Sequence, residues 1–381
     1  MKEAKKKNLF RLFVGNTVLF LNIIAVVLLF LSYLASWISP DLIWILAFFG
    51  LAYPVFLVIN IVFMLYYLIR LKRYLFISLI AILIGYFHVG NLVSLRKKAI
   101  PEGVEPINVL SYNVRNFDLY NYKKNWTLNF TNRDSIFSFV DKGDFDIICF
   151  QEFVYDKSGK FQTLDTLQDF QKARHAHAAY TKNSRNLNFF GIATFSAFPI
   201  VNKGKIPFRT QAGNICIFTD IKKANDTIRV YNIHLESIGL SQEDYQFVEN
   251  MNNIIQTGEN QEIKTGGKRI FRRLKRAFLS RAEQAELVAE HIAKSPYPVI
   301  LTGDFNDTPS SYVYRVLSKN LRDAFHAGRG LGRTYVGSVP SFRIDYIMHS
   351  KTFDAYDFVT GNKKFSDHYP VYCKLVLRND N

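Results

Sequence analysis

Asp304 and Asn306 follow a short aliphatic run, residues 299–302, that has the composition of a buried strand. Gly303 ends that run and permits a sharp turn of the backbone. Alternate residues leave a strand end on the same side, so we expect both polar side chains to point into one cleft. A carboxylate can accept a proton or bind a cation there, and a carboxamide can donate to a phosphate oxygen. An ordinary strand-end turn with a helix-capping Asn has the same pattern, so other residues must decide between the two.

Polar residues also stand at the ends of other apolar runs in the second part of the chain. The whole set is Asn113, Glu152, His234, Asp304, Asn306, Asp345, Asp367 and His368. Its oxygen atoms are hard ligands of the kind that Mg²⁺ or Mn²⁺ takes, and its imidazoles suit proton transfer near neutral pH. We therefore expect the set to form one site that handles a metal ion and a proton.

The motifs that carry these residues occur in a characteristic order. They read Ser-Tyr-Asn, Gln-Glu, Asn-Ile-His-Leu, Gly-Asp-Phe-Asn, Arg-Ile-Asp-Tyr-Ile and Ser-Asp-His-Tyr-Pro. In this order the sequence resembles the endonuclease/exonuclease/phosphatase superfamily over residues 106–378, although each motif alone is weak. Members include deoxyribonucleases, abasic-site endonucleases, neutral sphingomyelinases and inositol-polyphosphate 5-phosphatases. The resemblance implies a Mg²⁺-dependent phosphoric ester hydrolase, with Mn²⁺ as a possible replacement.

The resemblance also implies that different residues bind the metal ion and carry out the acid/base chemistry. Glu152 would bind the divalent metal ion, with Asn113 and Asp367 completing or supporting the site. His368 would act as the principal acid/base or phosphate-contacting imidazole, and Asp345 would orient it. The alternatives are structural: Asn113 as a strand-end cap, and Asp367 with His368 as a plain turn.

The remaining motif residues would contact water and phosphate. By the same resemblance, Asp304 would activate or position the attacking water and Asn306 would bind the phosphate. His234 would contact the phosphate or the leaving oxygen. Asn188, just before an apolar run that begins at Phe190, is a further candidate phosphate contact.

The elements that must position these residues are mostly strands. Short apolar runs alternate with polar turns from residue 107 onward, and helical patterns occur at 133–142 and 280–294. So many apolar strands with few helices between them favour two β-sheets packed face to face with helices outside, an α/β four-layer sandwich. Such a scaffold presents polar residues at its strand ends.

The first hundred residues have a different composition. Three runs lack Asp, Glu, Lys and Arg, namely residues 12–40, 42–69 and 74–95. Each exceeds the roughly 20 residues that a helix needs to cross a bilayer. We therefore expect three transmembrane helices at about 12–36, 42–69 and 74–95, the first too long in its apolar core for a cleaved signal peptide.

These runs define the expected domains and topology. Residues 1–98 would form the membrane anchor, 99–106 a linker, and 107–381 the phosphoesterase domain. Lys and Arg are retained on the cytoplasmic side, so the basic flanks before the first helix and at 70–73 predict a multi-pass protein of the cytoplasmic membrane. Its catalytic domain would then face the extracytoplasmic side, although the basic residues at 96–98 oppose this orientation.

An insertion at about 241–279 contains a basic amphipathic segment, residues 268–278. Six of its first nine residues are Lys or Arg, and four apolar residues share one helical face. It is either a solvated face packed on the domain or a contact for anionic lipid or another polyanion. With the anchor it favours a phospholipid headgroup or other small phosphoester as substrate. The net charge of +16 leaves a nuclease acting on DNA or RNA as the alternative, with a non-catalytic binding protein third.

Overall fold

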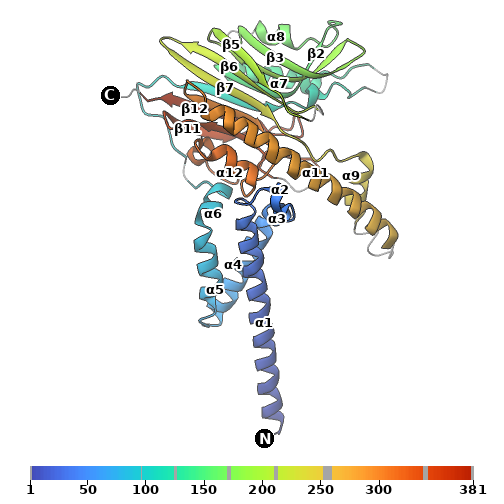
Figure 1. Cartoon of the computed structure of the whole chain (residues 1–381), viewed down its shortest axis with the longest axis vertical. Helices are drawn as coiled ribbons and strands as arrows, with labels where there is room; N and C mark the ends of the chain where they lie inside the picture. The colour runs from blue at the N-terminus through green and yellow to red at the C-terminus, as the bar shows by residue number, and fades with distance from the viewer. Residues whose placement is uncertain are drawn as a thin grey trace.

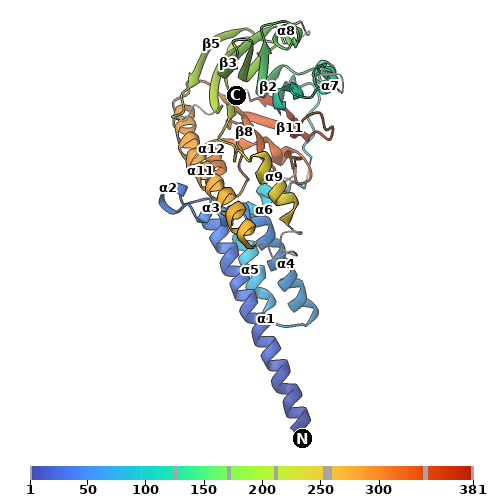
Figure 2. The same cartoon turned by 90° about the vertical axis from the view of Figure 1, so that its right-hand side faces the viewer.

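An apolar helical stalk carries a two-sheet sandwich in this computed structural model, with the amino terminus at the far end of the stalk (Figures 1 and 2). The structure describes residues 2–95, 97–123, 127–169, 173–209, 213–251, 260–337 and 342–378. We use "stalk" for residues 2–92 and "sandwich" for the described part of 107–377. Arg96, part of the predicted topology signal, lies outside the described residues.

The first sheet has the strand order β11-β12-β1-β2-β4-β3. Its central pair, β1 and β2, is parallel, and the other pairs are antiparallel. The strands are β1 (Ile107–Asn113), β2 (Ile147–Asp156), β3 (His175–Ser184), β4 (Asn188–Ser196), β11 (Phe353–Thr360) and β12 (Val371–Leu377). The parallel pair brings the carboxyl ends of β1 and β2 to the same edge of the sheet.

The second sheet has the order β5-β6-β7-β8-β10-β9. Here β7 and β8 are the parallel pair, and the others are antiparallel. The strands are β5 (Ile200–Ile206), β6 (Ile215–Lys223), β7 (Asp226–His234), β8 (Val299–Asp304), β9 (Arg322–Asp323) and β10 (Asp345–His349). Both sheets therefore have the same plan, with one parallel pair near the centre of a mainly antiparallel sheet.

Apolar side chains from both sheets fill the space between them, where Val109 and Ile147 pack in one cluster with Val230 and Ile300. Helix α7 (Thr131–Lys142) covers the outer face of the first sheet, and α11 (Asn260–Ala293) with α12 (Tyr312–Ser318) covers that of the second. Four short elements complete the sandwich: η1 (Arg115–Asp118), α8 (Leu164–Gln168), α9 (Gln242–Glu249) and η2 (Ala324–Ala327). The predicted α/β arrangement of two packed sheets flanked by helices is confirmed.

The prediction of three continuous transmembrane helices is wrong. The stalk contains α1 (Lys2–Leu34), α2 (Pro40–Ile43), α3 (Leu46–Leu51), α4 (Tyr53–Ile69), α5 (Leu75–Ile84) and α6 (Tyr86–Leu92). One helical segment among the described residues, Phe10–Leu34, is long and apolar enough to cross a membrane, or two if the bent pair α5 and α6 counts as one span. Hydropathy sums composition over a window and does not register where a helix breaks.

The breaks have local causes. Pro54 lies in the first turn of α4, where its missing N–H costs nothing, and this favours a new helix over continuation of α3. Helix α4 is then only 17 residues long. At Gly85 the chain bends by 69° between α5 and α6. A Cβ at Gly85 would lie 2.1 Å from the hydroxyl of Tyr33, so this position requires glycine for the approach of α1.

The predicted helical patterns at 268–278 and 280–294 form one helix, α11, which lies between the sandwich and the stalk (Figure 1). Phe271 stacks on Phe48 of α3 with ring centroids 4.8 Å apart, and Phe278 meets the same ring edge-on at 5.1 Å. Part of the apolar face of this helix is thus packed on the stalk. Residues 252–259 of the predicted insertion lie outside the described residues.

Candidate active site

The candidate site lies at one edge of the sandwich, where strand ends from both sheets meet. In the second sheet, Asp304 is the backbone partner of both His234 and Asp345. In the first sheet, Asn113 ends β1, and Glu152 lies in the neighbouring strand β2. The carboxamide nitrogen of Asn113 donates to Asp304 Oδ2 at 3.0 Å, so the two sheets are joined at this point.

Three of the site's backbone positions have positive φ angles. Glu152 has a φ of 50° at a bulge in β2, and Asn306 has a φ of 53° just beyond β8. Gly303 has a φ of 142°, and a Cβ there would lie 2.0 Å from the carbonyl oxygen of Ile233. Such conformations cost free energy for most residues and concentrate at functional sites. Gly303 is therefore what allows β8 to lie close to β7 just before Asp304.

His368 is held between two carboxylates. Its Nδ1 lies 2.8 Å from Asp345 Oδ2, and its Nε2 lies 3.8 Å from Asp304 Oδ2. Burial disfavours the charged imidazolium, but the charges of Asp345 and Asp304 outweigh it and raise the pKa of His368 to about 10. The imidazole is consequently protonated at neutral pH, and Asp345 holds its orientation.

Asp304 is at the centre of the hydrogen-bonded group. Its Oδ1 accepts from the backbone N–H of Asn306 at 2.8 Å. Burial and the neighbouring charge of Asp345 raise the pKa of Asp304 to about 6, against the opposing effect of the two imidazoles. Asp304 is therefore a carboxylate at neutral pH, with a pKa close enough to that range to take up a proton.

Glu152 and Asp367 supply the oxygen atoms on the other side of Asn113. Glu152 Oε1 accepts from Asn113 Nδ2 at 3.3 Å, and Asp367 Oδ2 lies 3.6 Å from Nε of Arg115. Burial, followed by repulsion from Asp367, raises the pKa of Glu152. The carboxamide oxygen of Asn113 accepts from the backbone N–H of Arg115 at 3.1 Å, so Asn113 connects carboxylates rather than offering a free oxygen.

These groups fit a divalent cation. Glu152 and Asp367 offer hard oxygen ligands, and their mutual repulsion would be relieved by a positive ion between them. A second buried group, Asp304, Asp345 and His368, also brings three possible ligand atoms within 4.8 Å of one another. In that group, however, the close contact between His368 and Asp345 already occupies one ring nitrogen.

His234 lies beside both groups. Its Nε2 is 3.8 Å from Asp304 Oδ2 and 3.9 Å from Glu152 Oε1, and this buried atom has no hydrogen-bond partner among the described residues. Burial lowers the pKa of His234, with a smaller contribution of the same sign from His368. A neutral imidazole with an unpaired ring nitrogen is therefore available to a substrate oxygen.

Two predicted phosphate contacts have different surroundings. The amide of Asn306 donates to the backbone carbonyl of Leu235 at 3.0 Å, which fixes the side chain at the edge of the cleft. Asn188 begins β4 opposite Asp156, four residues beyond Glu152 along β2. At about 3.3 Å per residue this is about 13 Å away, so Asn188 is not brought together with the others.

Residues outside the predicted set also contribute. The ring of Tyr335 meets His368 edge-on with centroids 5.3 Å apart, and its hydroxyl lies 3.5 Å from that of Tyr245. Tyr335 comes from a segment without helical or strand periodicity, so the sequence contains no signal for it. Arg115 follows Asn113 by two residues, and that proximity is a usable signal.

The catalytic candidates line a cleft with two parts. One hollow of about 440 Å³ is lined by Glu152, Asp304 and His368 together with apolar residues, and we call it the apolar arm. A second of about 580 Å³ is lined mainly by polar residues, and we call it the polar arm. The arms share Tyr245, Tyr335 and Asp367, and therefore meet at the catalytic candidates.

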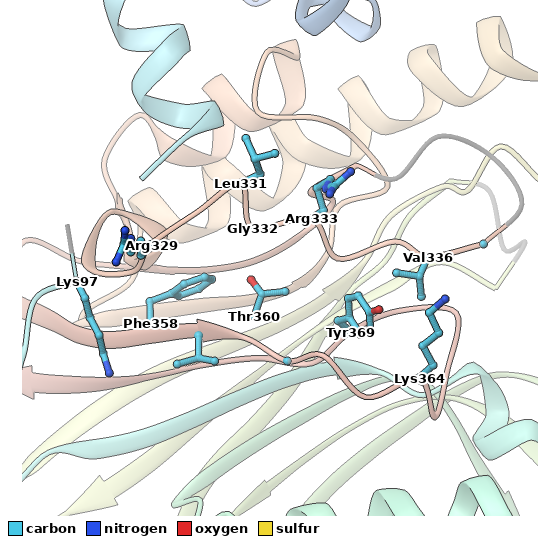
Figure 3. A pocket seen from close by; sticks show the side chains of 13 residues that line it. Lys97, Arg329, Leu331, Gly332, Arg333, Val336, Phe358, Thr360, Lys364 and Tyr369 are labelled. Atoms are coloured by element: carbon cyan, nitrogen blue, oxygen red, sulfur yellow. The ribbon is translucent and has the colours of Figure 1, made fainter. Parts of the chain in front are cut away.

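A larger hollow of about 730 Å³ adjoins the polar arm, with which it shares Val336, Gly337 and Lys364 (Figure 3). Four basic side chains line it, those of Lys97, Arg329, Arg333 and Lys364, and none of the predicted site residues does. Size alone therefore does not identify the candidate site, which we assign from its chemistry.

Comparisons with known proteins identify the family of the sandwich. A model of the endonuclease/exonuclease/phosphatase family matches residues 110–368, and a family described as a domain of unknown function matches residues 15–92. No curated protein matches the sequence.

Several solved structures are similar to part of this chain. A functionally unknown conserved protein from Enterococcus faecalis V583 is 15% identical with a TM-score of 0.50, and the match covers 71% of this chain and 100% of the other. An endonuclease/exonuclease/phosphatase family protein from Leptotrichia buccalis C-1013-b is 16% identical with a TM-score of 0.48, covering 71% and 99%. One from Bacteroides thetaiotaomicron is 21% identical with a TM-score of 0.46, covering 72% and 99%.

Proposed function

The chain belongs to the endonuclease/exonuclease/phosphatase family, and from this premise we propose that it is a membrane-anchored, divalent-metal-dependent phosphoesterase. Members of the family are hydrolases that act on phosphoesters. The observation that carries the proposal is the contact of His368 with Asp345 and Asp304 in the same cleft as Glu152. It combines an oriented acid, a base and a metal-ligating carboxylate.

The residues supply each part of a hydrolysis. Asp304, ionised above its pKa of about 6, takes the proton of a water whose oxygen attacks phosphorus. As that P–O bond forms, the P–O bond to the alcohol breaks, and the imidazolium of His368 gives its proton to the leaving oxygen. The unpaired Nε2 of His234 contacts a phosphate or leaving oxygen. Asn306 binds the phosphate from the end of β8.

The metal would be held by Glu152 and Asp367, with Asn113 fixing the position of Glu152. When bound there, Mg²⁺ or Mn²⁺ would neutralise charge on the non-bridging phosphate oxygens. Two observations support a metal site here: the two carboxylates, and the general use of divalent metals by enzymes of this family. We propose Mg²⁺ as the physiological ion, since its preferred ligands are oxygens.

Membrane anchoring is supported by the apolar surface of the stalk. Large apolar side chains remain exposed along α1, with Phe10 at 68% and Phe13 at 70% of their full exposure. Water is an unfavourable solvent for such a surface, and hydrocarbon a favourable one. We propose that α1 crosses the cytoplasmic membrane from its basic amino-terminal flank, with the sandwich on the extracytoplasmic side.

For the substrate we propose a phospholipid headgroup or another small phosphoester rather than a nucleic acid. Three of the six basic residues in 268–276 already pair within the protein, Arg269 and Arg273 with the buried Asp244 and Arg276 with Glu236, and this weighs against phosphate-backbone binding. These pairs use charges that a polyanion would need. They also remove the argument that this helix lies free on a lipid surface.

The experiment is a hydrolysis screen of the full chain, purified in detergent, over phospholipids, inositol phosphates, nucleotides and DNA. We expect Mg²⁺-dependent turnover of a phospholipid or small phosphoester, lowered about 100-fold or more in His368→Ala. Hydrolysis of DNA alone would favour the nuclease. Undiminished turnover by a folded His368→Ala variant would reject the mechanism.

A further inference from the structure

The apolar arm has the lining of a hydrocarbon site. Val248 of α9 lines it, as do Ile270, Leu274 and Phe278 of α11. Arg281 also lines the arm, but its guanidinium is buried and held by Asp307 at 3.0 Å and by the carbonyl of Glu236 at 3.0 Å. A hollow with such walls loses free energy when filled by water and gains it when filled by an alkyl chain.

This arm is continuous with the catalytic candidates, because Asp304 and His368 line its inner end. The polar arm leads away from the same point and is lined by Arg115, Asn132 and Lys364. A phosphorus atom placed where the arms meet would thus have an apolar surface on one side and hydrogen-bonding and charged groups on the other. These surroundings match a phosphoester that has an apolar group at one end and a polar group at the other.

The apolar arm also reaches the stalk. Leu51, at the end of α3, lines it together with α11. Helix α3 is pressed against the sandwich there, since a Cβ at Gly50 would lie 3.0 Å from the carbonyl oxygen of Ser310. In both views α3 lies at the head of the stalk beneath α11 (Figures 1 and 2). A chain leaving the apolar surface of the stalk therefore has the arm directly above it.

We propose that the apolar arm binds the hydrocarbon chain of an amphiphilic phosphoester, with the polar portion of the same molecule in the polar arm. The inference rests on the proposed function for the bond that is cleaved, but the binding of the chain can be measured without turnover. It assigns specificity to Ile270 and Leu274, which touch the chain and not the reacting atoms.

The test measures binding of ethyl-, butyl- and hexylphosphonate, which are not hydrolysed, to the full chain in nanodiscs of a zwitterionic lipid with Mg²⁺, by calorimetry. Each buried methylene strengthens binding about fourfold, so hexylphosphonate should bind about 200-fold more tightly than ethylphosphonate. Leu274→Trp fills the arm and Ile270→Asn makes it polar. Each should reduce this gain to about tenfold or less and leave ethylphosphonate binding unchanged.

Arg272→Gln is the matched control, because this exposed residue lies on the same helix and its described hydrogen bond is to the backbone carbonyl of Lys268. This variant should keep the whole difference in affinity between hexylphosphonate and ethylphosphonate. Affinity that does not grow with chain length in the native protein, or a full gain in both arm variants, would overturn the proposal.

Hydrolysis of 4-nitrophenyl alkyl phosphates of the same chain lengths separates the two claims. If the affinity does not change with chain length and every ester is hydrolysed at a similar rate, the hydrocarbon site is rejected and the phosphoesterase activity is retained. Chain-dependent binding without hydrolysis of any ester keeps the hydrocarbon site and rejects the phosphoesterase. Chain-dependent binding with a matching rise in kcat/KM supports both.

Discussion

Gly303→Ala should damage both the stability of the sandwich and the geometry of the candidate site. The residue has a φ of 142°, and its new Cβ would lie 2.0 Å from the carbonyl oxygen of Ile233. An unfavourable φ costs about 1–3 kcal/mol, and displacement of a central strand adds to it, so we expect a loss of about 3–5 kcal/mol. For a domain of this size that lowers Tm by about 10 °C.

The same displacement moves Asp304 away from His234, whose Nε2 lies 3.8 Å from it. A misplacement of about 1 Å can cost about 100-fold in rate, so the folded variant should be nearly inactive at 20 °C. Thermal unfolding and turnover are measured on the same preparation.

Gly159→Ala provides the control for this change. Its φ of 72° is also positive, but no atom lies within 4 Å of the added Cβ. It should lose only about 1–2 kcal/mol and keep full activity. If Gly303→Ala matched Gly159→Ala in both Tm and turnover, close packing of β8 on β7 would not be what positions the site.

Two further predictions concern charge and topology. Asp345→Asn should lower kcat by about 100-fold and move both limbs of the pH–rate profile to lower pH. Burial and the charge of Asp345 raise the pKa of Asp304 to about 6, where activity rises with pH, and the charges of Asp345 and Asp304 raise the pKa of His368 to about 10, where activity falls. Loss of the Asp345 charge therefore lowers both pKa values, and an unmoved alkaline limb would contradict this. A reporter that is active only in the cytoplasm, fused after Asn381, should be silent, and strong activity would reverse the proposed orientation.

The strand-end residues could be predicted from the sequence because their positions follow from local rules. His234, Asp304 and Asp345 each end or begin an apolar run. Parallel pairing of β7 with β8 places His234 beside Asp304, and antiparallel pairing of β8 with β10 places Asp345 there too. The order of the motifs, through the resemblance to the family, suggested the role of each of these residues. An apolar run does not determine the direction of a side chain, and the sequence did not indicate that one N–H of the Asn306 amide donates to the carbonyl of Leu235.

Features that depend on distant contacts could not be predicted. The periodicity of residues 268–278 identifies an apolar face, but not that Phe48 covers part of it. Hydropathy likewise identifies apolar runs but neither the bend at Gly85 nor the contact that Tyr33 of another helix makes there. Leu51 reaches the cleft for the same reason, through packing of the stalk on the sandwich.

We propose that Glu152 binds the metal ion and that Asp304 accepts the proton of the attacking water. A Mg²⁺ titration of turnover tests this division of roles most directly. Glu152→Gln should raise the Mg²⁺ concentration for half-maximal rate by about tenfold or more, since even supporting residues of metal sites cost about 10–100-fold in affinity. Asp304→Asn should lower the maximal rate about 100-fold without changing that concentration. Undiminished hydrolysis by the native protein in excess chelator, or identical Mg²⁺ dependence in Glu152→Gln, would contradict the account.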